Sequence, residues 1–270
     1  MSNFQMKFEV RPDLLAAPSK RRSGLSMAPG VRFIVAHDTG MPRSTARGNV
    51  RHYQNTVNLK SASAHLFVDD REIIECIPAL TGPPEKAWHV RYDVPQDDKL
   101  YGLDANDAAV GVEYCYGDNI DADRAYQRYV WVIALACHRF NLNPQGSVVG
   151  HWVLDPQRRT DPMTGLAASL RSYEQLLLDI VTEFEVCTGI AAPPPVTPPP
   201  PGTQQRVRLR ANANIRRGQP ARTAPIARSL PAGTEVTVTG LVSGERVNGI
   251  ADWYSLTGNE FLWSGVTLGP

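Results

Sequence analysis

The residues of this sequence best suited to chemistry are two histidines that end apolar, strand-like runs. His37 closes VRFIVAH (31–37) and His151 closes SVVGH (147–151), and a polar loop follows each. Asp161 lies ten positions after His151, beyond a turn-prone segment with paired arginines. A catalytic zinc site needs three nitrogen, oxygen or sulfur ligands and one open position. Two strand-end histidines on adjacent strands, together with Asp161, would supply that set. The alternative is a buried histidine and an unrelated surface aspartate.

Glu113 is a further candidate because it is a charged residue in an otherwise apolar strand, VGVEYCYGDN (110–119). An unpaired buried carboxylate is strongly unfavourable. We therefore expect Glu113 to pair with an arginine, to be exposed in a cleft, or to face a metal. The other histidines are weaker candidates. We place His52 and His138 on helix surfaces and expect His65, at the start of a strand, to be a structural residue.

The elements that must position these side chains begin with strands. Residues 108–116 alternate so that Val110, Val112 and Tyr114 share one face of a strand. Residues 64–77 form two strand-like runs around an Asp-Asp-Arg turn, which predicts a β-hairpin. With the runs that end in the two histidines, these segments supply several strands of one sheet.

Three segments between these strands are predicted to be helices. Residues 44–55 follow a helix-capping residue, Ser44. Residues 121–140 and 166–186 each carry an apolar stripe at helical spacing. The stripes are Tyr126, Val130, Ile133, Cys137 and Phe140 in the first, and Leu170, Tyr173, Leu177, Ile180 and Phe184 in the second. The pattern as a whole predicts an α/β fold, a mixed central β-sheet flanked by helices.

A proline-rich segment, AAPPPVTPPPPGTQQ (191–205), divides the chain. Such proline density favours an extended, semi-rigid spacer over a helix or a sheet, although it could also be a ligand for another domain. We therefore expect a domain over residues 1–190, a linker over 191–205, and a second domain over 206–270. In the last part, short strand-like runs alternate with turn signals, which predicts a small all-β barrel.

Composition narrows the classes of partner. The 270 residues carry 28 Lys+Arg against 27 Asp+Glu, a net charge of +1, which does not favour nucleic acid or an anionic membrane as a partner. No run approaches the roughly 20 apolar residues of a membrane span, and no signal-peptide pattern opens the sequence. We expect synthesis as a soluble cytoplasmic protein. Cys76 and Cys115 are expected to be free buried thiols, with a disulfide as the alternative.

The chemistry-bearing segments together resemble a known family, the zinc-dependent N-acetylmuramoyl-L-alanine amidases of the phage-lysozyme and peptidoglycan-recognition type. The matching segments, in the family's order, are FIVAHDTG, SASAHLFVDDREIIECIP, AWHV, VGVEYCYGDN and VVGHWVLDPQRRTDP. They span roughly residues 31–165. Each is weak alone, and five in order are specific. The resemblance implies the amidase fold for the first domain.

The resemblance also implies roles for single residues. His37, His151 and Asp161 would be the three Zn²⁺ ligands, with Asp161 standing where relatives use either Asp or Cys. Glu113 would be the acidic residue that handles protons near the attacking water. Each assignment rests on the match of its motif.

Residues around the ligands receive roles in the same way. His89, in AWHV, matches a cleft histidine that contacts the substrate, and Trp88 beside it would pack the cleft wall. Many relatives carry lysine two positions before the third ligand, and this chain has Arg159 there. Arginine keeps its charge at working pH, so it would stabilise an oxyanion and would not donate a proton. The local turn decides whether Arg159 or Arg158 faces the site.

The C-terminal part resembles bacterial SH3-like cell-wall-binding domains over most of residues 206–268. NIRRGQ (214–219) stands where those domains have an Asn-Ile-Arg signature, and WYSL and FLWSG match their closing strands. Trp253, Tyr254 and Trp263 are candidate wall contacts. The alternative is that these rings fill a small core.

The resemblance implies a peptidoglycan hydrolase that cuts the amide bond between N-acetylmuramic acid and L-alanine of the stem peptide, with Zn²⁺ as cofactor. The wall would be contacted through residues 206–270, as in an endolysin or autolysin that reaches the wall on release or lysis. Two alternatives remain open: a non-catalytic peptidoglycan-recognition protein and a cytoplasmic amidase that recycles wall fragments. The oligomeric state is left open.

Overall fold

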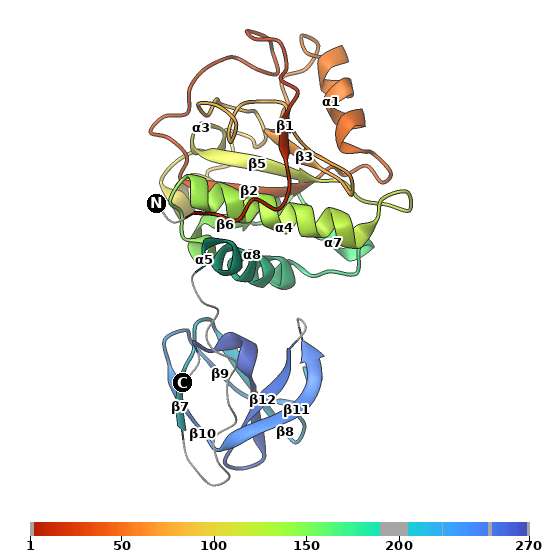
Figure 1. Ribbon diagram of the computed structural model, residues 1–270. Coiled ribbons are helices and arrows are strands. Elements are labelled where there is room, and N and C mark those ends of the chain that lie inside the picture. Colours follow the sequence, from red (N-terminus) through yellow and green to blue (C-terminus); the bar gives the residue numbers. More distant parts are fainter. Residues whose placement is uncertain (1–2, 190–204, 223, 248–249, 269–270) are drawn as a thin grey trace. The chain divides into compact units, whose positions relative to one another are not determined.

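The chain divides into two compact units, Met1–Ile190 and Ala191–Pro270. The computed structural model describes residues 3–189, 205–222, 224–247 and 250–268 (Figure 1). The predicted proline-rich linker lies outside the described residues except for Gln205. Each unit has its own hydrophobic core, so each is described separately below.

The first unit is built on a six-stranded mixed sheet, which confirms the predicted fold class. Its strands, in the order in which they lie side by side, are β1 (Val10–Pro12), β4 (Ile73–Glu75), β3 (Leu66–Val68), β5 (Ala109–Tyr114), β2 (Phe33–Asp38) and β6 (Val148–Gly150). Strands β3 and β4 are antiparallel, as the predicted hairpin requires, and the other neighbours are parallel. The parallel strands β5, β2 and β6 therefore end at one common edge.

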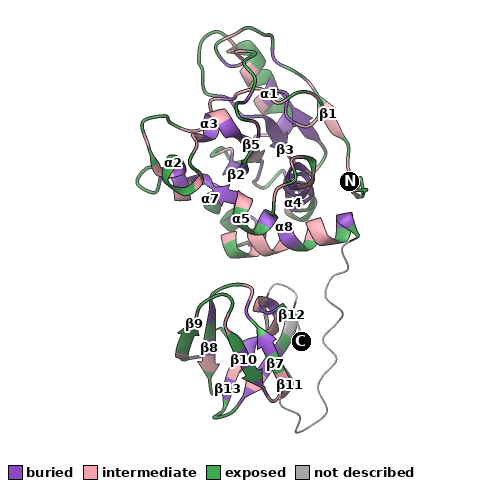
Figure 2. Cartoon of the chain, turned by 90° about the vertical axis from the view of Figure 1, so that its left-hand side faces the viewer, coloured by how far each residue is buried: buried purple, intermediate pink, exposed green. Residues whose placement is uncertain are grey.

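Helices cover this sheet on both faces. They are α1 (Ala46–Asn55), α2 (Gln96–Tyr101), α3 (Ala105–Ala108), α4 (Ala122–Arg139), α5 (Pro144–Ser147), α6 (His151–Leu154), α7 (Met163–Ala168) and α8 (Tyr173–Thr188). Helix α4 packs on β5, β2 and β3, and α8 packs against α4 (Figure 1). Helix α1 packs on β3 and β4. Figure 2 shows β2 and β5 in the colour of buried residues.

Side chains alternate along β2 and β5, so the two faces of each strand have different neighbours. One face joins the main core beneath α4, with Ile34 and Ala36 from β2 and Val110, Val112 and Tyr114 from β5. This confirms the predicted face of residues 108–116. Successive residues of a strand point to opposite faces. His37 and Glu113, which are paired in the register of β2 and β5, therefore belong to the face away from α4.

The cap of α1 differs from the prediction by one residue. Thr45, rather than Ser44, is the N-cap, and its hydroxyl accepts a hydrogen bond from the N–H of Gly48 at 3.1 Å. Ser44 instead donates to the carbonyl of Met41 at 2.8 Å, inside the preceding turn. Adjacent hydroxyl residues have the same capping chemistry, so the sequence alone does not rank them.

The predicted helix over residues 166–186 is wrong at its start. Leu170 has a positive φ of 56° and is 91% exposed, so it ends one helical segment and does not contribute to a stripe. The hydroxyl of Ser172 then caps α8 by accepting from the N–H of Gln175 at 3.1 Å. The remaining apolar positions of the stripe lie in α8, and Ile180 is fully buried.

The second unit is all-β, as predicted. Its strands are β7 (Gln205–Arg208), β8 (Ala213–Arg217), β9 (Ile226–Leu230), β10 (Glu235–Val238), β11 (Gly240–Val247), β12 (Ile250–Leu256) and β13 (Glu260–Trp263), followed by the 3₁₀ turn η1 (Ser264–Val266). They form two sheets, β10-β7 and β11-β12-β13-β8-β9. Trp253, Tyr254 and Trp263 are buried, so of the two predicted alternatives the structure shows the packing role.

Two further expectations concern the cysteines and the membrane. Cys76 and Cys115 are free, buried thiols in one apolar cluster beneath α1. Burial in apolar surroundings raises the pKa of the Cys76 thiol, which keeps it protonated. Among the described residues, no helix has the length and apolar character needed to span a bilayer.

Candidate metal centre

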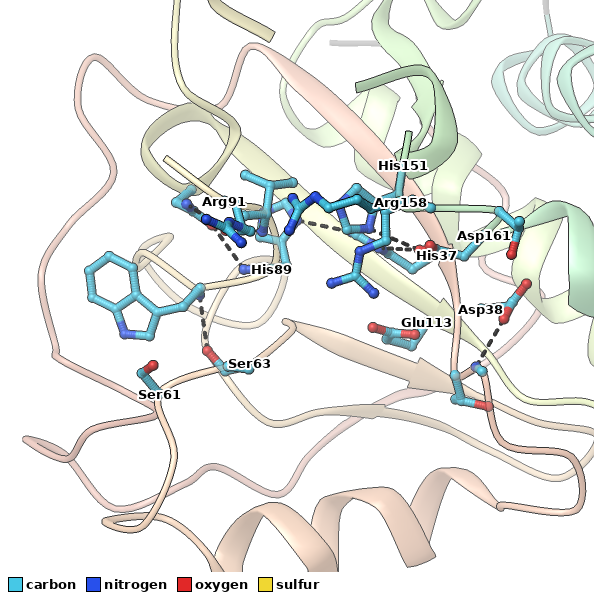
Figure 3. A pocket seen from close by; sticks show the side chains of 18 of the residues that line it. His37, Asp38, Ser61, Ser63, His89, Arg91, Glu113, His151, Arg158 and Asp161 are labelled. Carbon is cyan, nitrogen blue, oxygen red and sulfur yellow. Dashed lines mark hydrogen bonds and ion pairs between the residues drawn. The ribbon is translucent and has the colours of Figure 1, made fainter. Parts of the chain in front are cut away.

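His37, His151 and Asp161 converge in the structure. The Nδ1 atom of His37 lies 2.9 Å from Oδ2 of Asp161, and Nδ1 of His151 lies 3.0 Å from the same oxygen. The three atoms lie within 4.8 Å of one another, and all three residues are buried (Figure 3). Two imidazole nitrogens and one carboxylate oxygen are a donor set that suits Zn²⁺ with a fourth position for water or substrate. The residues present therefore fit a zinc ion.

Local structure explains this convergence. His37 lies in β2, and His151, which we predicted to be the last residue of a strand, is the first residue of α6, directly after β6. Strands β2 and β6 are parallel neighbours, which brings the two histidines to one edge of the sheet. The loop after α6 brings Asp161 back to His151, because the N–H of Trp152 donates to the carbonyl of Asp161 at 2.9 Å. Gly150 permits this fold, since a Cβ there would lie 2.9 Å from Cδ of Pro162.

Electrostatics favour the protonation states of His37 and Asp161 that bind a metal. Burial is the main reason that the pKa of His37 falls to about 4, so its imidazole is neutral at neutral pH. Burial acts to raise the pKa of Asp161, but the close contacts with His151 and His37 outweigh it and the pKa falls. A neutral imidazole and an ionised carboxylate are the forms that bind a metal.

Glu113 lines the same cavity from β5, one strand away from His37 (Figure 3). Its Oε2 atom is buried and has no hydrogen-bond partner. Burial, with the nearby charges of Asp161 and Asp38, raises the pKa of Glu113 well above its ordinary value, and Arg159 opposes the shift. Of the three predicted environments, the structure excludes a salt bridge to any described arginine. The carboxyl group faces the cavity instead.

Asp38 is a buried carboxylate at the site that the sequence analysis missed. Its Oδ1 accepts the N–H of Gly40 at 2.9 Å and its Oδ2 accepts the N–H of Gly165 at 2.8 Å. It therefore ties β2 to α7, just beyond the loop that carries Asp161. The signal was present, because Asp38 follows His37 directly at the end of an apolar strand, the same argument that identified Glu113.

His65 and His89 lie behind the metal-binding group. Gly111 donates its N–H to Nδ1 of His65 at 2.9 Å, and Nε2 of His65 faces the carbonyl of Glu85 at 2.9 Å. The expectation that His65 is a structural residue is confirmed. His89 is also buried and engages both ring nitrogens, one with His37 at 3.0 Å and one with the carbonyl of Ala109 at 3.1 Å. Neither nitrogen is free for a substrate.

The metal-binding group lies in a cavity of about 950 Å³. Trp88 lines it, and its backbone N–H donates to the hydroxyl of Ser63 at 3.0 Å. Tyr92 lies beside Trp88, with ring centroids 6.1 Å apart. Sequence reasoning missed Tyr53, Ser61, Ser63 and Tyr92 as lining residues. Their spacing carries no signal, because they come from α1 and from loops that meet only in the folded chain.

The two arginines of the loop differ in their contacts. Arg158 forms an ion pair with the buried Asp155, through Nη2 and through Nε at 3.2 Å. Arg159 lines the cavity and forms no ion pair with any residue that the structure describes. Its positive charge is close enough to oppose the raised pKa of Glu113. Arg159 is thus the arginine whose charge is available to the site.

A family model described as N-acetylmuramoyl-L-alanine amidase (Amidase_2) matches residues 27–164 of this chain. N-acetylmuramoyl-L-alanine amidase BlyA of Bacillus subtilis (strain 168) is 33% identical over 141 residues, 48% of this chain and 36% of BlyA. The chain thus spans about a third of the length of the curated relatives that it matches.

Solved structures show a similar fold. The hydrolase AmiA of Staphylococcus aureus, solved in complex with its ligand, superposes with a TM-score of 0.56 at 23% identity, covering 70% of this chain and 89% of that one. The catalytic domain of XlyA superposes with a TM-score of 0.51 at 21% identity, covering 64% of this chain and 99% of that one. The mixed sheet with its flanking helices is thus a fold found in solved structures.

Proposed function

Because the chain belongs to the N-acetylmuramoyl-L-alanine amidase family, we propose that it hydrolyses the bond between N-acetylmuramic acid and L-alanine of the peptidoglycan stem peptide. The convergence of His37, His151 and Asp161 in one cavity carries the proposal. These residues would hold Zn²⁺. The ion would supply the Lewis acidity that makes water a nucleophile at neutral pH and polarises an amide carbonyl.

Glu113 would handle the protons of this reaction. Hydrolysis of an amide needs a group that takes a proton from the attacking water and returns one to the leaving amine. A carboxyl group that faces the cavity and has a raised pKa suits both steps. Arg159, which has no competing carboxylate among the described residues, would stabilise the negative charge that develops on the carbonyl oxygen.

The cavity is large enough for more than the scissile bond. Pockets that bind ligands of drug size usually have volumes of about 300–1,000 Å³, and this one, at about 950 Å³, lies at the upper end. Trp88 and Tyr92 would provide an apolar wall for the sugar or the stem peptide. Ser61 and Ser63, which also line the cavity, would offer hydroxyl groups to peptide amides.

We propose a wall-binding role for the second unit, as an SH3-like domain. Its two small sheets around one apolar cluster, with NIRRGQ (214–219) beginning in β8, support this assignment. The burial of its three predicted aromatic contacts shifts the binding surface to exposed polar residues of the strands. The biological setting would be that of an endolysin or autolysin.

The test is digestion of purified, insoluble cell wall by the full chain, with mass spectrometry of the soluble products. We expect stem peptides with a free L-alanine amino terminus. A chelator should stop their release and added Zn²⁺ should restore it. His37→Ala should release no peptide, and His52→Ala, an exposed histidine on α1, is the matched control that should behave like the parent. Wall binding without any cleavage would instead identify a non-catalytic recognition protein.

A further inference from the structure

The direction of two hydrogen bonds fixes the tautomer of His37. Nε2 of His89 lies 3.1 Å from the carbonyl oxygen of Ala109, which can only accept, so this nitrogen carries a hydrogen. In a neutral imidazole the other nitrogen then has the lone pair. Nδ1 of His89 lies 3.0 Å from Nε2 of His37 and must accept a hydrogen from it. Nδ1 of His37 is thereby left without a hydrogen.

This tautomer has a consequence at Asp161. The bare Nδ1 of His37 and the ionised Oδ2 of Asp161 are 2.9 Å apart, and both are acceptors. Two acceptors at that distance repel each other unless a cation lies beside both. The two hydrogen bonds that start at the carbonyl of Ala109 thus turn the lone pair of His37 toward the position that a metal would take. Ligating histidines are commonly oriented by a partner of their second nitrogen.

The sheet is shaped to hold the ring of His89. Gly111 of β5 lies against it, and a Cβ at that position would be 2.9 Å from both Cγ and Nδ1 of the ring. The backbone N–H of His89 donates to the side chain of the buried Asn106 at 2.8 Å. His89 is only 8% exposed. The ring is therefore held from behind and offers little surface to a substrate.

We propose that His89 is a positioning residue that orients His37 for metal binding, rather than a residue that binds the substrate. The inference rests on the proposed function to the extent that His37 must be a metal ligand. It predicts that loss of the acceptor at residue 89 weakens zinc binding about 10- to 100-fold, the range found for partners of ligating histidines. Substrate binding at saturating zinc should change little.

The test is the zinc dissociation constant of the full chain, measured by competition with a chromophoric chelator. His89→Leu should weaken binding 10- to 100-fold, and His89→Asn, whose amide oxygen can take the place of Nδ1, should recover most of that loss. His65→Gln is the matched control, since His65 is a neighbouring buried histidine that contacts no metal-binding residue through its nitrogens. It should bind zinc like the parent.

Nitrogen-15 NMR of the unaltered zinc-loaded chain provides a measurement that needs no variant to fold. His37 and His89 should both carry their hydrogen on Nε2. A hydrogen on Nδ1 of His89 overturns the inference, as does a His89→Leu chain that binds zinc like the parent and loses only substrate affinity, seen as a raised KM. Absence of zinc binding by the parent overturns the proposed function itself, so the two failures are distinguishable.

Discussion

Replacing Glu113 with glutamine should stabilise the folded chain while it lowers the proposed amidase activity. The carboxyl group is held on β5 with Oε2 buried and unpaired, and burial raises its pKa well above the ordinary value. A group kept in an unfavourable environment lowers stability unless something compensates for it. Glutamine has nearly the same shape and no charge to bury. The proposed catalytic role accounts for a carboxylate in this position.

The size of the stabilisation follows from the buried oxygen. A buried acceptor without a partner costs about 1–3 kcal/mol. A charged group costs more than a neutral one when it is buried without a partner, and glutamine removes only this charge-related excess, so we expect a gain of about 1–2 kcal/mol in the free energy of unfolding at pH 7. General acid–base catalysis contributes about 10²- to 10⁴-fold to a rate. The activity of Glu113→Gln should fall by that factor, equivalent to about 3–5 kcal/mol of activation free energy.

The pH dependence of the stabilisation has a definite sign. Because the pKa of Glu113 is higher in the folded chain than in the unfolded one, the folded chain holds its proton more tightly. Below the ordinary glutamate pKa of about 4.3, both forms are protonated and the variant has no charge-related advantage. As pH rises above that value, ionisation is easier in the unfolded chain, so the parent loses stability and the variant does not.

The assay is urea unfolding of parent and variant at pH 4, 5.5 and 7 with a chelator present, so that no metal charge compensates for the carboxylate. The two curves should nearly coincide at pH 4, and the variant should be the more stable at pH 7. Zinc content is measured separately and should be unchanged. A variant that is less stable at pH 7, or a difference that is the same at pH 4 and pH 7, refutes the view of Glu113 as an uncompensated buried carboxyl group.

Three further predictions concern the support of the site. Asp38→Asn should lose about 1.5–3 kcal/mol of unfolding free energy, because an amide nitrogen would face one of its two N–H donors; an unchanged urea midpoint contradicts this. Gly150→Ala should weaken zinc binding in calorimetry, since its Cβ would overlap Pro162 and move the Asp161 loop; parent-like affinity shows that the loop adapts. Asp104 caps α3, and burial raises its pKa to about 6. The folded chain therefore loses stability relative to the unfolded chain as pH rises from about 4 to about 6, where Asp104 ionises more easily in the unfolded chain. Asp104→Asn keeps the cap and should be about 1 kcal/mol more stable at pH 7, after allowance for solvent screening, but equally stable near pH 3.5 in urea titrations.

The core of the site could be predicted because strand periodicity and strand order are strong constraints. An apolar strand that ends in histidine places that side chain at the edge of a parallel sheet, and two such strands bring the histidines together. Glu113 could be found because a charge interrupts an apolar alternation. In both cases the signal lies in a residue that departs from the pattern of its own element.

The supporting residues could not be predicted, because their roles arise from contacts between distant segments. His89 reaches His37 across 52 positions of sequence, and nothing in its neighbourhood marks both ring nitrogens as engaged. From the sequence, Gly111 appears only as a residue that destabilises a strand. Its role is to leave space for the ring of His89. Leu170 fits a helical stripe by type, but its backbone conformation is set by the turn that ends α7. The local sequence pattern does not predict contacts of this kind.

The same two strands carry both stability and chemistry: one face packs in the main apolar core, and the other packs Phe33, Val35 and Ala109 in a second apolar cluster before it reaches the site. The face of β2 and β5 beneath α4 is closely packed and apolar, and this packing fixes the register of the two strands. The opposite face carries His37, Gly111 and Glu113, residues that would each weaken an ordinary core. A shift of one residue in register would exchange the two faces entirely. The stability of the apolar face under α4 thus allows the site to contain a buried histidine, an unpaired carboxyl group and a glycine.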